Sequence, residues 1–143
     1  GWVSWKDTDE ELLAFTQRLS ALRRRFGVFR QRNFLHSRPR PADDLPDLEW
    51  WPPDGRPQTD ADWHDYALTI GVIMRASAET IRDSGDEEVF AVFNAGHARD
   101  VILPPGKWVR MLDSANPDAP HKPVAESYKA AEQSFVLFAH PET

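Results

Sequence analysis

The stretch EVFAVFNAGHARDVILPP, Glu88–Pro105, decides the fold because it holds two strand-like runs separated by a short turn. Val89–Phe93 is apolar at every position, whereas a strand with one wet face would alternate apolar and polar residues. We therefore expect this run at the centre of a sheet, covered on both faces. Asn94–Ala98 contains residues that accept positive φ. Val101–Leu103 then returns, and the two prolines after it end the pairing. The sequence predicts a β-hairpin here.

Short strand-like runs separated by turn residues continue on both sides of this stretch. The predicted strands are Leu48–Trp51, Leu68–Ala76, Trp108–Leu112, Ser127–Ala131 and Ser134–His140. Thr59–Asp62 is expected to cap one helical turn that ends near His64, and the proline-rich Asn116–Pro123 is expected to be a loop. About seven short strands of this kind are typical of an antiparallel β-sandwich. We therefore expect a mainly β fold.

One amphipathic helix, Thr8–Phe26, precedes these strands. Thr8 and Glu11 have the spacing of a capping box, and Gly27 is placed to follow the last turn. Five large apolar residues recur at spacings of 3 and 4 and so lie on one stripe: Leu12, Phe15, Leu19, Leu22 and Phe26. A helix this well specified at the start of a β-rich chain suggests an element carried over from a preceding domain.

The composition is that of a globular protein with many loops. Six tryptophans and eight phenylalanines are too many for a disordered segment, while twelve prolines indicate many loops. The chain contains no apolar run of roughly 18 residues and no signal-peptide pattern, so we expect a cytoplasmic location and no membrane contact. The absence of cysteine excludes disulfides, thiolate chemistry and cysteine-based zinc sites.

A basic segment interrupts an otherwise acidic chain. Between Arg18 and Ala42 there are eight arginines and no acidic residue, although the net charge is −6. Arginine-rich segments bind phosphate backbones in some proteins, so a nucleic-acid-binding domain is one alternative. The structural interpretation is favoured, because three of the arginines, Arg23–Arg25, end the predicted helix, where the helix dipole stabilises positive charge.

Several motifs together resemble the C-terminal region of bacterial glycogen debranching enzymes of the isoamylase type, in the α-amylase superfamily. The motifs are Trp2-Val3-Ser4-Trp5, Leu12–Arg25 (LLAFTQRLSALRRR), LEWWPPDG at 48–55, Thr59–Trp63, Phe93-Asn94-Ala95 and LPPGKW at 103–108. Ser4 departs from the pattern, since the family usually has aspartate there. The resemblance covers almost the whole chain, and the order and spacing of the motifs carry it.

The resemblance implies a division of the chain and a role. Residues 1–27 would be the last loop and helix of a catalytic barrel, 28–46 an exposed connector, and 47–143 a C-terminal β-sandwich domain. A (β/α)₈ barrel needs about 250 residues, so the family's catalytic carboxylates would lie before this chain. The chain is then expected to stabilise the barrel of an α-1,6-glucosidase and to be inactive alone. A stand-alone carbohydrate-binding module is the main alternative.

No residue of this chain is assigned to catalysis, a cofactor or a metal. Retaining glycoside hydrolysis needs two carboxyl groups about 5 Å apart, and Asp60, Asp62 and Asp65 are better explained as turn-forming and helix-capping residues. The five histidines lack metal-ligand spacing, and His64 beside Asp65 is interpreted as a structural pair.

Aromatic and apolar residues supply the candidate contact surfaces. Trp50, Trp51 and Trp63 are candidates for contact with glycan or with the barrel, because sugars stack on exposed indoles. Trp50 and Trp51 point to opposite faces of a strand, so only one of them can lie in the core. Candidate interdomain contacts are Trp2 and Trp5 together with the helix stripe, that is Leu12, Phe15, Leu19, Leu22 and Phe26. The expected partners are therefore the barrel, glycogen or maltooligosaccharide, and a second copy of the chain through the exposed helix.

Overall fold

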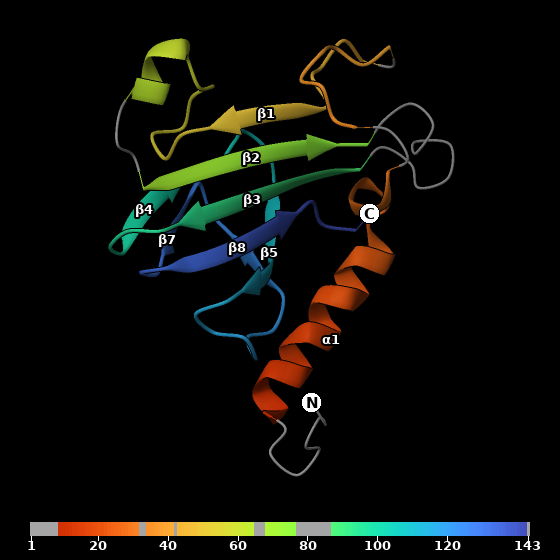
Figure 1. The fold of residues 1–143 in the computed structure, drawn as a ribbon, viewed down its shortest axis with the longest axis vertical. Coiled ribbons are helices and arrows are strands. Elements are labelled where there is room, and N and C mark those ends of the chain that lie inside the picture. The colour runs from red at the N-terminus through yellow and green to blue at the C-terminus, as the bar shows by residue number, and fades with distance from the viewer. Residues whose placement is uncertain (1–8, 32–33, 42, 65–67, 77–86, 143) are drawn as a thin grey trace, which may run out of the picture.

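The computed structural model describes residues 9–31, 34–41, 43–64, 68–76 and 87–142, with the side chains of Trp63 and His64 left out. Within these ranges the fold is mainly β, with one α-helix and eight strands in antiparallel sheets (Figure 1). The strands are β1 (Leu48–Trp51), β2 (Thr69–Arg75), β3 (Glu88–Asn94), β4 (Arg99–Ile102), β5 (Trp108–Asp113), β6 (Lys122–Val124), β7 (Ser127–Ala130) and β8 (Ser134–Ala139). The predicted antiparallel sandwich with an N-terminal helix is confirmed.

The main sheet has six strands in the order β1-β2-β3-β8-β5-β6, and β4 and β7 form a second sheet. Side chains between the main sheet and the β4–β7 sheet form the inner core, which includes Trp51, Ile73, Phe90, Val101, Trp108 and Phe138. A second cluster lies on the other face of the main sheet, which we call the outer face. The central strand β3 is therefore covered on both faces over Val89–Val92, as its continuous apolar run predicts.

The predicted hairpin is wrong. β3 pairs with β2 on one side and β8 on the other, so it has no edge left for β4, which pairs with β7. The buried Asn94 diverts the chain between the sheets: its Nδ2 donates to the carbonyls of His97 and Ala131, and its Oδ1 accepts from the Gly96 amide. The sequence correctly predicts a turn after Asn94, but β4, the strand that follows the turn, pairs with β7 rather than with β3.

The strand β6 lies partly inside the segment predicted to be a loop. It pairs with β5 at the edge of the main sheet, with Pro123 opposite Val109. An edge strand tolerates proline because its outer side needs no ladder hydrogen bond. The prolines of this segment therefore led to the prediction of a loop where the structure has the strand β6.

The helix α1 spans Glu10–Arg25 and is capped by Asp9, whose Oδ1 accepts from the Leu12 amide at 3.0 Å. Thr8, the predicted cap, lies outside the described residues. At the other end Phe26 leaves the helical conformation, and the 3₁₀ helix η2 (Gly27–Arg30) follows at once. Figure 1 shows α1 extending away from the main sheet, with its first turn farthest from the strands. None of the described helices is long and apolar enough to cross a membrane.

The segment predicted to be an exposed connector, 28–46, is partly anchored. Val28 and Arg40 are buried. The Arg40 guanidinium pairs with Asp43 and donates to the Ala76 carbonyl, and Pro39 bridges Pro46. Phe34, in contrast, is 94% exposed. The expectation of an exposed segment is wrong at Arg40 because its charge is neutralised by Asp43.

Candidate functional site

The residues of the helix stripe differ in how far they are covered. Leu22 is buried on the outer face of the sheet, and Phe15 and Phe26 pack partly against the same cluster. Leu12, however, is 60% exposed, and Leu13 and Leu19 are also exposed. The edge of the stripe formed by Phe15 and Leu22 therefore belongs to this domain, and the leucines beside it face solvent. Trp2 and Trp5 lie outside the described residues.

A second exposed apolar region lies on the outer face of the main sheet. Ile70, Phe93 and Phe135 stand side by side on β2, β3 and β8, and the rings of Phe93 and Phe135 are 5.0 Å apart between centroids. We call these three residues the sheet patch. Phe93 is 48% exposed, so the expectation that the apolar run of β3 would be buried throughout is wrong at its last position. The sheet extends beyond the helix there, and nothing among the described residues covers the Phe93 ring fully.

The helix stripe and the sheet patch belong to the same face of the molecule. Alternation along β3 places Phe93 on the side of Ala91, and Ala91 clusters with Leu22 of α1. Phe135 also packs partly against this cluster. The packed residues of the helix stripe and the sheet patch therefore lie on the same face of the main sheet. Sequence reasoning missed the sheet patch, because the exposure of Phe93 depends on where the helix ends rather than on the local pattern.

The two tryptophans of β1 separate as predicted. Trp51 is 6% exposed in the inner core, and its Nε1 donates to the Ile102 carbonyl at 3.2 Å. Trp50 is 36% exposed and points to the outer face, since it pairs directly with Val72. Trp63 lies in the 3₁₀ helix η3 (Asp60–His64), and its side chain is outside the described part. Trp50 is therefore the one of the pair that an external partner can reach.

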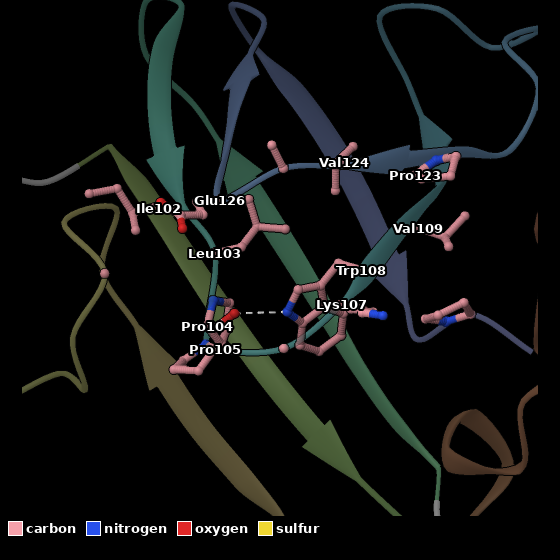
Figure 2. A pocket seen from close by; sticks show the side chains of 14 residues that line it. Ile102, Leu103, Pro104, Pro105, Lys107, Trp108, Val109, Pro123, Val124 and Glu126 are labelled. Carbon is pink, nitrogen blue, oxygen red and sulfur yellow. Dashed lines mark hydrogen bonds between the residues drawn. The ribbon is translucent and has the colours of Figure 1, made fainter. Parts of the chain in front are cut away.

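A groove of about 700 Å³ lies at one end of the sandwich, between the β4–β5 turn and the segment that joins β6 to β7 (Figure 2). Its walls are mostly apolar, and Lys107 and Glu126 are the charged residues among the described ones that line it. Trp108 lies at its base with its indole Nε1 donating to the Pro104 carbonyl at 2.9 Å. Because Trp108 is almost fully buried, it offers no face for a sugar to stack on. One carboxylate cannot supply the acid and nucleophile of glycoside hydrolysis.

The candidate carboxylates of η3 are engaged in local structure. Asp62 accepts from both terminal nitrogens of Arg56 at 2.7 Å and from the Thr59 amide at 2.6 Å. These hydrogen bonds, with that from Arg56 the strongest, hold the pKa of Asp62 well below its usual range. A general acid needs a raised pKa, so Asp62 acts as a cap, as the sequence indicates. Asp65 lies outside the described residues.

Several arginines of the basic segment are likewise engaged within the chain, and the described residues form no metal site. Over the described ranges, no three or more histidine, aspartate or glutamate side chains gather in a way that could hold a metal ion. Arg18 donates to the Pro117 and Ala119 carbonyls, Arg25 pairs with Glu142, and Arg30 donates to the Arg23 carbonyl. These contacts favour the structural interpretation of the arginine-rich segment.

Comparison with known proteins gives a result that agrees with the resemblance found in the sequence. No protein-family model matches the chain. Three curated proteins, each named "Glycogen operon protein GlgX homolog", are 32% identical to it over 131 residues; one is from Mycobacterium bovis and two are from strains of Mycobacterium tuberculosis. The match covers 81% of this chain but 18% of each relative, so the chain corresponds to less than a fifth of their length. The resemblance that the sequence motifs carry is therefore confirmed, and this chain is similar to a part of the GlgX-type glycogen operon proteins.

Proposed function

We propose that this chain is the non-catalytic C-terminal part of a glycogen debranching enzyme, which hydrolyses α-1,6-glucosidic branch linkages in the cytoplasm. The observation that carries the proposal is the match to GlgX homologues over most of this chain and a small share of theirs. The unmatched part of such a relative has room for a barrel of about 250 residues. Residues 1–27 would then be the barrel's last loop and helix, 28–46 the connector and 47–143 the C-terminal domain.

The chain would stabilise the barrel through its outer face. Leu12 and Leu19 are exposed on α1, which packs on that face through Leu22, and Phe93 of the sheet patch is also exposed. Burying one large apolar side chain gains roughly 1.5 to 3 kcal/mol, so a surface that covers all three would contribute several kcal/mol to the stability of the joined enzyme. Apolar surface of this kind marks interaction sites.

Hydrolysis by the purified chain tests the non-catalytic role. We expect no reducing ends above a buffer blank with glycogen or its limit dextrins. Release that disappears on mutating a carboxylate of this chain would contradict the proposal. The DNA upstream of the Gly1 codon tests the assignment independently: it should encode an in-frame barrel with an acidic pair, and a start codon immediately before Gly1 would contradict it.

A carbohydrate-binding role is the second candidate, and the exposure of Trp50 favours it. If Trp50 stacks on glucose units, maltooligosaccharide should shift the indole N–H resonance of Trp50 and leave that of Trp51, in the core, unchanged. Trp50→Ala should abolish the binding. Absence of any shift at millimolar oligosaccharide would leave packing against the barrel as the role of Trp50.

Self-association of the isolated chain is expected from the same exposed leucines. Sedimentation should show dimers or larger species, and replacing Leu12 and Leu19 by Glu should yield a folded monomer. Phe34→Glu is the matched control, because Phe34 is more exposed than either leucine but lies outside the outer face's two apolar regions.

A further inference from the structure

His140, the residue after β8, makes hydrogen bonds with both of its ring nitrogens. Nε2 lies 2.7 Å from Oε1 of Glu88, and Nδ1 lies 2.7 Å from the backbone carbonyl oxygen of Lys107. Glu88 begins β3, and Lys107 directly precedes β5. These are the two strands that flank β8 in the main sheet, so one side chain joins the ends of three adjacent strands.

Both partners of the ring are acceptors. A carbonyl oxygen has no proton to donate, and a neutral imidazole has a single N–H. Glu88 is kept ionised because Arg75 Nε donates to its other oxygen, Oε2, at 2.6 Å. Arg75 is itself shared with Glu49 of β1. The two short contacts can be hydrogen bonds at the same time only if His140 is an imidazolium that donates from both nitrogens.

The surroundings of the ring suit a cation. The His140 ring stacks on Trp108, with centroids 4.0 Å apart and planes 27° from parallel, and the face of an indole attracts positive charge. Gly106 in the preceding turn has a φ of +127°, and a Cβ there would lie 3.4 Å from Cε1 of His140. The glycine therefore lets the turn close against the ring.

The charged groups around His140 come from several elements. They are Glu88 of β3, Arg75 of β2, Glu49 of β1, Lys107 before β5, and the residues that share a hollow of about 250 Å³ with it, Arg25 of α1, His121 and Glu142. Burial and the neighbouring Arg25 and Arg18 lower the pKa of His121. The hydrogen bond to Glu88 outweighs desolvation and raises the pKa of His140.

The segment that His140 fixes leads back to the helix. Two residues later, Glu142 pairs with Arg25 in the last turn of α1. We propose that His140 is a proton-dependent latch: its imidazolium ties the chain after β8 to β3 and to the β4–β5 turn, and loss of the proton loosens this tail and its contact with α1. The latch would set how firmly the C-terminal end of α1 is held on the sheet.

Nitrogen-detected NMR of the whole chain tests the first part of the proposal. At pH 6 both ring nitrogens of His140 should carry protons, with a titration midpoint above 6.5, the ordinary value for histidine. Glu88→Gln, which removes the charge but keeps an oxygen acceptor, should lower that midpoint. A singly protonated ring at pH 6, or a midpoint that Glu88→Gln leaves unchanged, would overturn the latch.

Hydrogen-exchange protection of the tail and of the last turn of α1 tests the second part. Protection factors, corrected for the intrinsic effect of pH, should fall roughly 3- to 10-fold as His140 loses its proton, as expected for one lost hydrogen bond. His140→Gln should show the low protection both below and above the pH at which His140 titrates. His97→Gln, at an almost fully exposed histidine, should match the unmodified chain. If His140→Gln does not fold, the comparison is made with Glu88→Gln. Protection that does not follow the His140 titration would overturn the proposal.

Discussion

Phe90 and Phe93 lie three residues apart on β3 but face opposite sides of the main sheet. Phe90 is fully buried between Trp108 and Phe138, with centroids 6.0 Å and 5.9 Å away. It also lies against Gly71, where a Cβ would come within 2.5 Å of its ring. Phe93 touches Phe135 but is half exposed on the outer face. The two residues therefore separate core packing from surface contact within one strand.

Phe90→Ala should lower the free energy of unfolding by about 3 to 5 kcal/mol, because it empties a fully enclosed aromatic site. Phe93→Ala should cost only about 1 kcal/mol in the isolated chain, since roughly half of the ring is already in water. Urea denaturation of both variants measures the difference. Equal losses would mean that the sheet patch is covered within the domain itself.

The Glu88–His140 pair predicts a bell-shaped dependence of stability on pH. The pKa of His140 is raised, so its contribution is complete below 6.5, the value in the unfolded chain, and is lost as pH rises through the folded value. Burial raises the pKa of Glu88, but hydrogen bonds from His140 and Arg75 outweigh it and leave the pKa below 4.5. That contribution is complete above 4.5 and is lost as pH falls. In thermal melts, the contribution of the pair to the melting temperature should be largest between about pH 4.5 and 6.5. His140→Gln should remove the fall in melting temperature on the alkaline side.

At the scale of elements, strands could be predicted from local pattern and their partners could not. The strands observed at Leu48–Trp51 and Ser134–Ala139 follow from aromatic and β-branched content between turn residues, the second having been predicted as Ser134–His140. The pairing of β4 with β7 is accompanied by hydrogen bonds of the buried Asn94 to the carbonyls of His97 and Ala131, which no local rule reveals. The strand β6 was missed because proline at an edge position resembles a loop.

The helix α1 should respond differently to changes at its buried and at its exposed apolar positions. Leu22→Ala should destabilise the isolated domain by about 2 to 4 kcal/mol, because Leu22 packs into the outer cluster. Leu12→Glu should change stability by less than about 0.5 kcal/mol, as is usual for exposed positions. Chemical denaturation decides between them. If Leu12→Glu is as damaging as Leu22→Ala, Leu12 also belongs to the domain's own core.

At the scale of the whole molecule, part of the exposed apolar surface could be predicted from the sequence. The opposite orientations of Trp50 and Trp51 and the apolar stripe of α1 could be predicted from periodicity alone. The sheet patch could not, because it arises where α1 stops covering the outer face and where three strands bring Ile70, Phe93 and Phe135 into register. Exposure of this kind is a property of the assembled layers.

The proposed role of the outer face is to stabilise a catalytic barrel encoded before Gly1. The most direct measurement is the melting temperature of that upstream polypeptide, expressed without this chain, before and after the purified chain is added. The chain should raise the melting temperature and increase hydrolysis of glycogen branches; the double substitution Leu12→Glu and Phe93→Glu should abolish both effects, and Phe34→Glu should preserve them. An unchanged melting temperature with the unmodified chain, or an equal rise with the doubly substituted one, would contradict the account.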